Sequence, residues 1–280
     1  MVTPPILPSP LPRPAVDAHT HLDMLDTPVD EALTAARTAN ITRVVTVGCD
    51  IPSSTWAATT AQSHPHVYAA VAIHPNNTGS IAQLTSLERV DHAIDPLVGA
   101  VRELAERPEV VAVGETGLDY YWDDSPPEVQ QRFFREHIAI AKRVGKALMI
   151  HDRDAHSDVL RILAEEGAPD QVIFHCFSGD AEMAKVCAEN GYVMSFAGTV
   201  TFKNAGSLRE AALVAPPELI LAETDAPYLT PMPNRGKRNS PAMAAYTIRF
   251  LAELKGIDLG EFCDTLTANA ARVFGWPSPQ

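Results

Sequence analysis

Eight short, nearly continuous apolar segments alternate with stretches of helical spacing, and this alternation limits the possible folds more than any other feature of the chain. The segments are 14–19, 42–48, 67–73, 110–115, 146–151, 171–176, 191–196 and 218–223. Apolar runs of this length are typical of strands buried on both faces, as in a parallel sheet. Eight strand–helix units predict an α/β fold of the (β/α)8 TIM barrel type. The alternative is an open doubly wound sheet, but its usual glycine-rich loop after the first strand is replaced here by His-Thr-His.

The length of 280 residues fits one barrel domain. The first fourteen residues include six prolines, so we expect residues 1–13 to be an irregular proline-rich tail. Residues 14–280 show no shift in composition and are predicted to form a single domain.

The composition favours a globular enzyme of a reducing compartment. Hydrophobic residues make up 46% of the chain and charged residues 20%. The cysteines show no CxxC pair, which favours the cytoplasm; they are Cys49, Cys176, Cys187 and Cys263. The first residues lack the basic-then-apolar pattern of a secretory signal, and no run approaches the ~18–20 apolar residues that span a bilayer.

The net charge of −13 limits the ways in which this chain can bind a polyanion. Proteins whose affinity depends on neutralising phosphates usually have a basic face. If the substrate is a nucleic acid, the attraction must come from bound cations and a local basic loop.

Residues that commonly bind metals follow five of the predicted strands. In the stretch VDAHTHL (16–22), strand alternation places Asp17, His19 and His21 on one face. The other strand ends add further residues, and the full set is His19, His21, Glu115, His151, His175 and Asp225. The carboxyl ends of barrel strands meet at one face, so we expect these groups to gather and hold one or two divalent ions.

Each of these residues also has a simpler interpretation. A lone strand-end histidine is more often hydrogen-bonded in the core, Glu115 could cap a loop, and Asp225 could belong to an ordinary turn. The joint placement after five strands favours the metal interpretation. The remaining histidines are predicted to be surface residues, namely His64, His66, His92, His137 and His156. Cys176 is predicted to lie in the core, turned away from the site.

Several motifs resemble one known family. They are VDAHTHLD, AIHP (72–75), VGETGLDYY (113–121), IHDRDA (150–155), HCFSG (175–179), SFAGTVTFKNA (195–205) and ETDAPYL (223–229). Together they resemble the TatD-type metal-dependent deoxyribonucleases, a branch of the amidohydrolase-like barrels, from about residue 14 to residue 275. Asn239-Ser240-Pro241 departs from the Asn-Glu-Pro of many members, so contacts made by that acid are not expected here.

The resemblance implies a divalent-metal hydrolase whose ligands are the six strand-end residues. Many amidohydrolase relatives bridge two metals with a carbamylated lysine, but the fourth strand has Glu115 and no lysine, so we expect Glu115 to bridge two ions. Zn, Mg, Mn and Co are all compatible with such ligands. We expect Asp225 to accept the proton of the attacking water, which makes Asp225 and Glu115 the predicted catalytic residues.

Phosphate-binding groups are expected near the strand ends. The predicted substrate contacts are His74, Arg153, Lys203 and Arg235, the last within a basic loop at 230–240. Arg153 is preferred because a guanidinium binds phosphate through two hydrogen bonds. Tyr120, Tyr121 and Trp122 either stack on bases or pack beneath their own loop, and packing is favoured.

The predicted function is a nuclease, a 3′–5′ exonuclease-like deoxyribonuclease that trims single-stranded DNA or RNA ends. The first alternative keeps the metals but hydrolyses a small ester, lactone or amide, which the acidic charge favours. The second is a non-catalytic binding scaffold, which the complete ligand set disfavours.

Overall fold

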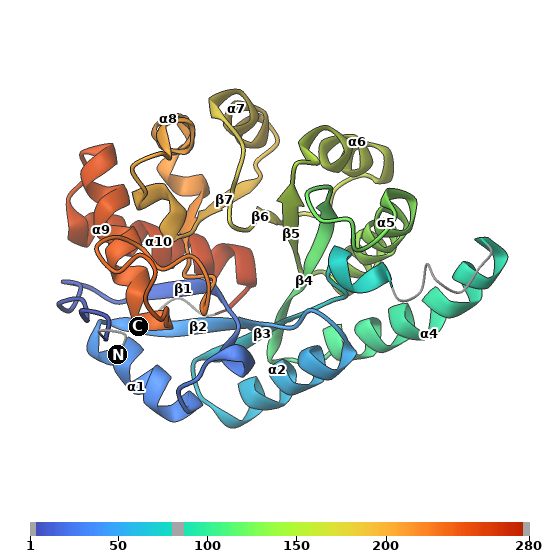
Figure 1. Ribbon diagram of the computed structural model, residues 1–280, viewed down its shortest axis with the longest axis horizontal. Helices are drawn as coiled ribbons and strands as arrows, with labels where there is room; N and C mark the ends of the chain where they lie inside the picture. The colour runs from blue at the N-terminus through green and yellow to red at the C-terminus, as the bar shows by residue number, and fades with distance from the viewer. Residues whose placement is uncertain (1–3, 80–86, 277–280) are drawn as a thin grey trace. The chain divides into compact units, whose positions relative to one another are not determined.

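The computed structural model describes residues 4–79 and 87–276, which form two compact units (Figure 1). The first unit comprises Met1–Thr46 and His175–Gln280, and the second comprises Val47–Phe174. Among the described residues, none of the helices combines the length and the hydropathy that a bilayer span requires.

The first unit contains four strands and their helices. Its strands are β1 (Ala15–Thr20), β2 (Ile41–Val47, which ends at the unit boundary), β7 (Val193–Phe196) and β8 (Ile220–Ala222). Its α-helices are α1 (Val29–Thr38), α7 (Ala181–Glu189), α8 (Gly206–Val214), α9 (Ala244–Lys255) and α10 (Leu259–Phe274). Short 3-10 helices are η1 (Leu22–Met24), η3 (Gly198–Thr201), η4 (Pro217–Leu219) and η5 (Pro241–Met243). Helix α10 packs against β1 and β8.

The second unit repeats the same alternation. Its strands are β3 (Val67–Val71), β4 (Val110–Asp119), β5 (Ala147–Arg153) and β6 (Val172–Phe174). Its helices are α2 (Ile51–Ser63), η2 (Pro75–Thr78), α4 (Leu87–Ala105), α5 (Pro127–Val144) and α6 (His156–Glu166). Helices α5 and α6 pack against β4 and β5 (Figure 1).

The strands follow one another in the sheet in chain order, from β1 to β8. The registered neighbour pairs, such as β1–β2, β4–β5 and β7–β8, are parallel. Each strand is followed by a helix, which is the topology of a (β/α)8 barrel and excludes the doubly wound alternative. The predicted fold class is confirmed, and each of the eight predicted segments overlaps a strand.

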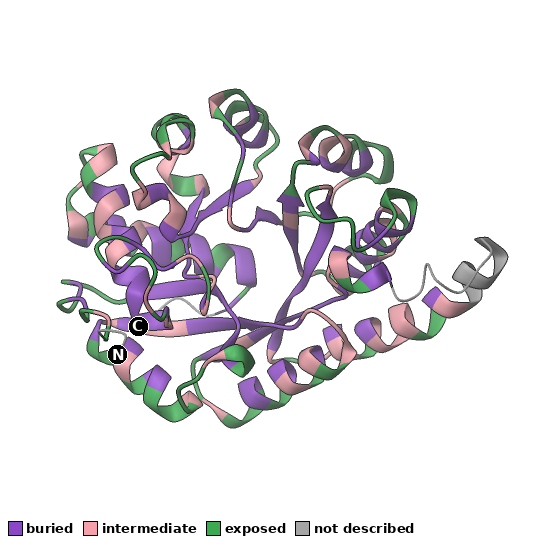
Figure 2. Ribbon diagram, in the orientation of Figure 1, coloured by how far each residue is buried: buried purple, intermediate pink, exposed green. Residues whose placement is uncertain are grey.

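Burial explains why the strands could be recognised from apolar runs. All six residues of β1 and all ten of β4 are buried, polar residues included (Figure 2). Helix α5 buries one face, including Phe133, Phe134 and Ile138, and ends at Gly145, whose φ of 63° is left-handed. Glycine adopts this conformation without a steric penalty, which explains why α5 ends at this residue.

The start of α5 differs from what its sequence indicates. Ser125-Pro126-Pro127-Glu128 has the spacing of a capping box and predicts a cap at Ser125, but Pro126 occupies the cap position and the helix has no side-chain cap there. The Ser125 hydroxyl instead pairs with that of Thr78, at 2.5 Å. The buried Thr78 offers a competing partner that sequence spacing does not show.

The predicted surface position of His137 is wrong. Its ring is fully buried in α5, where Nδ1 donates to the Phe133 carbonyl at 2.6 Å and Nε2 accepts from the Ile73 amide at 3.2 Å. Its position on the buried face of α5, four residues after Phe133, explains this burial. The side chain of His92 lies outside the described residues.

Residues 4–14 have no regular secondary structure. Residues within 4–12 nevertheless form hydrogen bonds with other parts of the first unit. The side-chain amide of Asn234 pairs with the backbone of Ile6 in both directions, at 2.8 and 2.7 Å. Tyr246 donates to the Ile6 carbonyl at 3.2 Å, and Lys237 donates to that of Pro4 at 3.3 Å. This segment, residues 4–12, therefore holds the loop that contains Asn234 and Lys237.

Candidate metal centre

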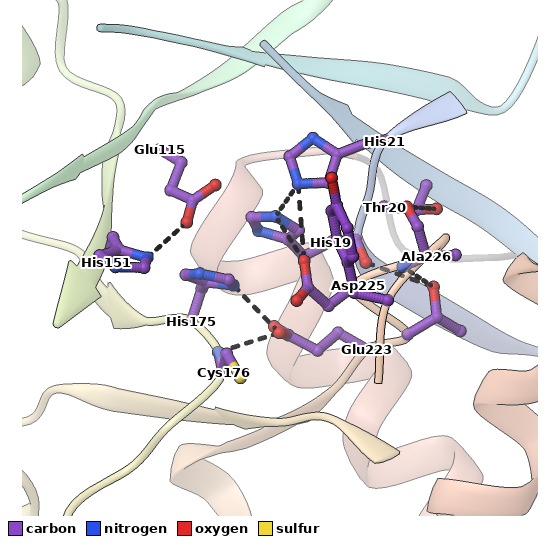
Figure 3. Close-up of polar contacts among 12 residues, drawn as sticks. His19, Thr20, His21, Glu115, His151, His175, Cys176, Glu223, Asp225 and Ala226 are labelled. Carbon is purple, nitrogen blue, oxygen red and sulfur yellow. Dashed lines mark hydrogen bonds and ion pairs between the residues drawn. The ribbon is translucent and has the colours of Figure 1, made fainter. Parts of the chain in front are cut away.

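Two histidines at the end of β1 meet an aspartate that follows β8. The Nε2 atoms of His19 and His21 lie 3.3 Å apart (Figure 3). The Asp225 Oδ1 atom lies 3.6 Å from the first of them and 3.5 Å from the second. The three ligand atoms therefore form a nearly equilateral triangle.

This triangle fits a metal ion. A tetrahedral ion bound at about 2.1 Å from each ligand separates its ligands by roughly 3.4 Å. The three edges match that separation, and the ligands are two imidazoles and a carboxylate, which zinc and similar ions prefer. These residues therefore fit a divalent ion.

His175 extends this group, which with Glu223 we call the β1–β8 cluster: His19, His21, His175, Glu223 and Asp225. The rings of His19 and His175 stack with centroids 3.9 Å apart. His175 Nδ1 lies 3.1 Å from Glu223 Oε1, which also accepts the Cys176 amide at 2.9 Å (Figure 3). Burial raises the pKa of Glu223, and His175 opposes that shift. A carboxylate on the second ring nitrogen is the usual support of a metal-binding histidine.

Backbone bonds between β1 and the residues after β8 hold the cluster in place. The Asp225 amide donates to the His19 carbonyl at 2.9 Å, and the His21 amide donates to the Ala226 carbonyl at 2.8 Å. Asp225 has a φ of 52°, a left-handed conformation that aspartate adopts more readily than most residues. These bonds fix the directions of all three ligands of the triangle.

Asp17 has a different role from the histidines that alternate with it. It is fully buried and accepts hydrogen bonds from the Thr224 amide at 2.8 Å and hydroxyl at 2.6 Å. Burial raises the pKa of Asp17 well above its usual range, although Thr224 opposes the shift. Asp17 thus joins β1 to the end of β8.

The second unit holds its own group, the β4–β5 cluster: His74, Glu115, Asp119 and His151. Glu115 Oε1 lies 2.7 Å from His151 Nδ1 and 3.4 Å from His74 Nε2. Glu115 is 3% exposed, so this carboxylate is taken out of water. Ligand atoms of His74, Glu115 and His151 lie close enough together to share a cation.

The hydrogen bonds of His74 indicate that its ring acts as a hydrogen-bond donor and not as a metal ligand. Its Nδ1 accepts a hydrogen bond from the Asn76 amide at 3.1 Å. In a neutral imidazole the other nitrogen then bears the proton, so Nε2 faces Glu115 as a donor. This arrangement suits the predicted contact with substrate better than it suits metal binding.

Asp119 is a site residue that the sequence analysis missed. Its Oδ2 lies 2.9 Å from His151 Nε2, and its Oδ1 accepts the amides of Tyr121 and Trp122 at 3.0 and 3.2 Å. Burial raises the pKa of Asp119, but hydrogen bonds led by that of His151 outweigh it and lower the pKa to about 2. The carboxylate is therefore ionised and orients the His151 ring.

Two glycines beside Glu115 allow β4 to approach β5 closely. A Cβ on Gly114 would lie 2.6 Å from the Met149 carbonyl oxygen, and one on Gly117 would lie 2.1 Å from that of His151. Gly117 also has a φ of 138°. The pattern GETG therefore sets Glu115 against His151 at hydrogen-bond distance.

The predicted phosphate contacts other than His74 are exposed. Arg153 ends β5 and lies over the Tyr121 ring, 3.9 Å from its centroid. Lys203 is exposed after η3. Arg235 lies over the ring of Phe202, the residue that precedes Lys203, at 4.3 Å from the ring centroid. Lys203 and Arg235 therefore share one region of the first unit.

Cys176 and Ser240 are both half-buried. Cys176 is half-buried, so its predicted core position is not found; β6 ends at Phe174, and strand alternation no longer applies. Ser240 is half-buried at the start of η5, where its amide donates to the Asn239 side chain at 2.9 Å. Asn239 in turn donates to the Thr224 carbonyl.

Of the two missed residues, only Asp119 had a detectable signal. It lies four residues after Glu115 within β4, and even spacing in a strand places side chains on one face. Glu223 follows the end of β8, and Asp225 has a left-handed φ, so strand alternation does not apply there.

Comparison with known proteins agrees with this geometry. Residues 16–275 match the sequence profile of the family described as TatD related DNase. A Mycobacterium tuberculosis protein named uncharacterized metal-dependent hydrolase TatD is 46% identical over 270 residues, covering 93% of this chain and 97% of the relative. The Bacillus subtilis protein YabD, also named an uncharacterized metal-dependent hydrolase, is 40% identical over 261 residues, covering 92% and 98%.

Solved structures show the same fold. YjjV, a TatD homologue from Escherichia coli, superposes with a TM-score of 0.84 at 28% identity, covering 94% of this chain and 98% of the other. An uncharacterized amidohydrolase from Saccharomyces cerevisiae gives a TM-score of 0.77 at 18% identity, covering 93% and 100%, and shows the fold alone. Together with the family match, these relatives show that the chain is a metal-dependent hydrolase and belongs to the TatD-related DNase family.

Proposed function

We propose that this hydrolase is a nuclease that cleaves phosphodiester bonds at the ends of single-stranded DNA or RNA, as a 3′–5′ exonuclease-like deoxyribonuclease. The observation that carries the proposal is the triangle of His19, His21 and Asp225, whose edges fit a divalent ion. The family description as a DNase supports the choice of a phosphodiester.

The ligand set of the proposed centre is His19, His21, Glu115, His151, His175 and Asp225. We propose that these residues hold two divalent ions, of Zn, Mn, Co or Mg, with Glu115 as the bridging ligand. Support comes from their positions at the ends of parallel strands, because such ends share one edge of a sheet. Divalent ions bound there would lower the pKa of water and stabilise negative charge on the phosphoryl oxygens.

The chain's own residues orient the substrate and move the proton. Asp225 accepts a proton from the attacking water, whose oxygen bonds to phosphorus. The bond between phosphorus and the leaving oxygen of the strand then breaks, and that oxygen takes a proton from solvent. When substrate is bound, His74 Nε2 donates its proton to a phosphoryl oxygen in place of Glu115, while Arg153, Lys203 and Arg235 provide cationic contacts.

The net charge of −13 favours a second candidate, hydrolysis of a small ester, lactone or amide at the same centre. A chain with this charge repels a polyanion at long range. The cytoplasm is the proposed location, on the basis of the cysteine spacing.

Elemental analysis together with a substrate panel tests both candidates. The panel contains linear and circular single-stranded DNA, duplex DNA, single-stranded RNA and p-nitrophenyl esters, each with and without chelator. We expect about two divalent ions per chain and chelator-sensitive cleavage of linear single strands. The matched control is His64→Gln, a histidine outside both clusters, which should behave as the wild type.

The outcomes separate the candidates. Hydrolysis of the small esters without cleavage of any nucleic acid would support the second candidate. Equal rates on circular and linear single strands would refute end-directed cleavage. Full activity in chelator would refute the metal centre itself.

A further inference from the structure

An exposed group of aromatic rings and a guanidinium lies beside the β4–β5 cluster. Tyr121 and Trp122 are 55% and 51% exposed, and their rings meet edge to face with centroids 4.9 Å apart. The Arg153 guanidinium lies 3.9 Å from the Tyr121 centroid and 5.7 Å from that of Trp122. We call these three residues the aromatic platform.

The rings of the aromatic platform do not serve to pack the loop that carries them. Tyr120 is the packing residue of the three neighbouring aromatics, because its hydroxyl donates to Asp158 at 2.8 Å and accepts from Gln131 at 2.7 Å. Tyr121 and Trp122 instead leave half of their surface in water. Exposing two large rings next to each other is costly unless a ligand covers them.

The platform is also fixed to the β4–β5 cluster. Both aromatic residues donate their backbone amides to Asp119, which contacts His151 with its other oxygen. One buried carboxylate thus sets both the direction of a proposed metal ligand and the position of the two rings. A molecule lying on the platform is held close to the β4–β5 cluster.

We propose that the aromatic platform is a stacking subsite for one nucleobase of the single-stranded substrate, with Trp122 as the stacking ring. This inference rests on the proposed nuclease function. A planar base with a π face fits an exposed indole, and such stacking tolerates any base. Tyr121 holds Arg153 by a cation–π contact, so that the guanidinium can bind the adjoining phosphate.

The charges around the platform indicate that a nucleobase, and not a phosphate of the nucleic-acid backbone, contacts Trp122. Asp123 and Asp124 follow it directly, and both are exposed. Two carboxylates repel a phosphate beside the indole but leave an uncharged base unaffected. The base therefore lies on Trp122, and the phosphate lies on the side of Arg153.

The test compares Trp122→Ala with Trp122→Phe on a short single-stranded oligonucleotide and on the same oligonucleotide carrying one abasic residue, moved along the strand. Dissociation constants are measured by fluorescence anisotropy in chelator, and KM and kcat with metal present. We expect Trp122→Ala to weaken binding roughly 5- to 150-fold and to raise KM similarly, with kcat and metal content unchanged. Trp122→Phe should retain most of the affinity.

An abasic residue at the contacted position should weaken wild-type binding by the same factor and abolish the effect of Trp122→Ala. The control is Leu213→Ala on α8, because Leu213 is also 51% exposed. It should change nothing.

The outcomes distinguish this inference from the proposed function. Base-dependent binding through Trp122 without any cleavage would refute the nuclease and support the subsite. Cleavage that is insensitive to Trp122→Ala, or losses that are equal on intact and abasic strands, would refute the subsite and support the nuclease. If the protein neither binds nor cleaves single strands, both are overturned.

Discussion

At the scale of single residues, a buried carboxylate contacts the ring of each of two proposed metal ligands. Asp119 lies beside His151, and Glu223 lies beside His175, although the partners are 32 and 48 residues apart along the chain. Such contacts depend on how strands pair, which no local pattern specifies. The histidines could therefore be predicted from their places in or directly after strands, whereas spacing could mark only Asp119 as facing the same way as Glu115.

Asp225 is the residue whose change should affect the reaction most directly. Asp225→Asn keeps the size of the side chain and should preserve the fold, while removing a charge and a proton acceptor. We expect turnover to fall by ~10²-fold or more. Steady-state kinetics on single-stranded DNA, with circular dichroism as the check on folding, measure this. A variant that retains most of the wild-type turnover would identify another group as the base.

At the scale of elements, helix α5 shows where a pattern interpretation failed and why. His137 was assigned to the surface because it falls in a helical stretch and not at a strand end, but its ring accepts a hydrogen bond from the buried Ile73 amide, just after β3. Nε2 can accept that bond only as a neutral imidazole. Burial lowers the pKa of His137 from 6.5 to about 4, so the folded protein excludes its proton.

The consequence is an acid-sensitive contribution of α5 to stability. Below pH 6.5 the unfolded chain binds a proton that the folded chain does not, so the contribution is complete above pH 6.5 and is lost as pH falls toward 4. The total loss is about 3 kcal/mol. His137→Gln, which cannot titrate, should be less stable than the wild type at pH 7 and should lack this slope. Urea unfolding in chelator between pH 7 and 4.5 measures the difference, and parallel curves would contradict it.

The N-terminal segment, residues 4–12, is the second element with a predicted consequence. It lies before residue 16, where the family match begins, yet it pairs with Asn234 through two hydrogen bonds. Each contributes about 1 kcal/mol, so deleting residues 1–12 should make opening of the loop 230–240 roughly tenfold more frequent or greater.

Limited trypsin digestion followed by mass spectrometry measures that opening, because Arg235, Lys237 and Arg238 are all cleavage sites. The deletion variant should be cut faster at these positions. Cleavage after Lys185, on the exposed face of α7, serves as the internal control and should not change. Equal rates at the loop in both proteins would show that residues 4–12 do not hold it.

At the scale of the whole molecule, the fold could be predicted because the apolar runs of buried parallel strands are local. Every one of the eight runs overlaps a strand. The contacts that begin and end the neighbouring helices could be predicted less well, as Ser125 shows. Its spacing fits a helix cap, but a hydroxyl contact with Thr78, 47 residues away, replaces that role.

Net charge leads to a prediction for the whole chain. A protein at −13 has no general attraction for a polyanion, so phosphate contacts should be few and local. With two to four neutralised phosphates, we expect log Kd for single-stranded DNA to change with log salt at a slope of roughly 1.4–2.8. Arg153→Ala should lower the slope by roughly 0.7 without changing metal content. A much steeper wild-type slope would reveal a basic tract elsewhere.

The shared contacts of Asp119 have a thermodynamic consequence. Its two oxygens contact a proposed metal ligand and the amides of the Tyr121–Trp122 loop, so ordering either side favours the other. Linkage then requires reciprocity: if metal raises the affinity for an oligonucleotide by some factor, the oligonucleotide raises the affinity for metal by the same factor. Titrating each ligand at saturating concentrations of the other should give equal factors, and Asp119→Asn should bring both toward one. The enzyme would then retain its metal most firmly when a strand end is bound.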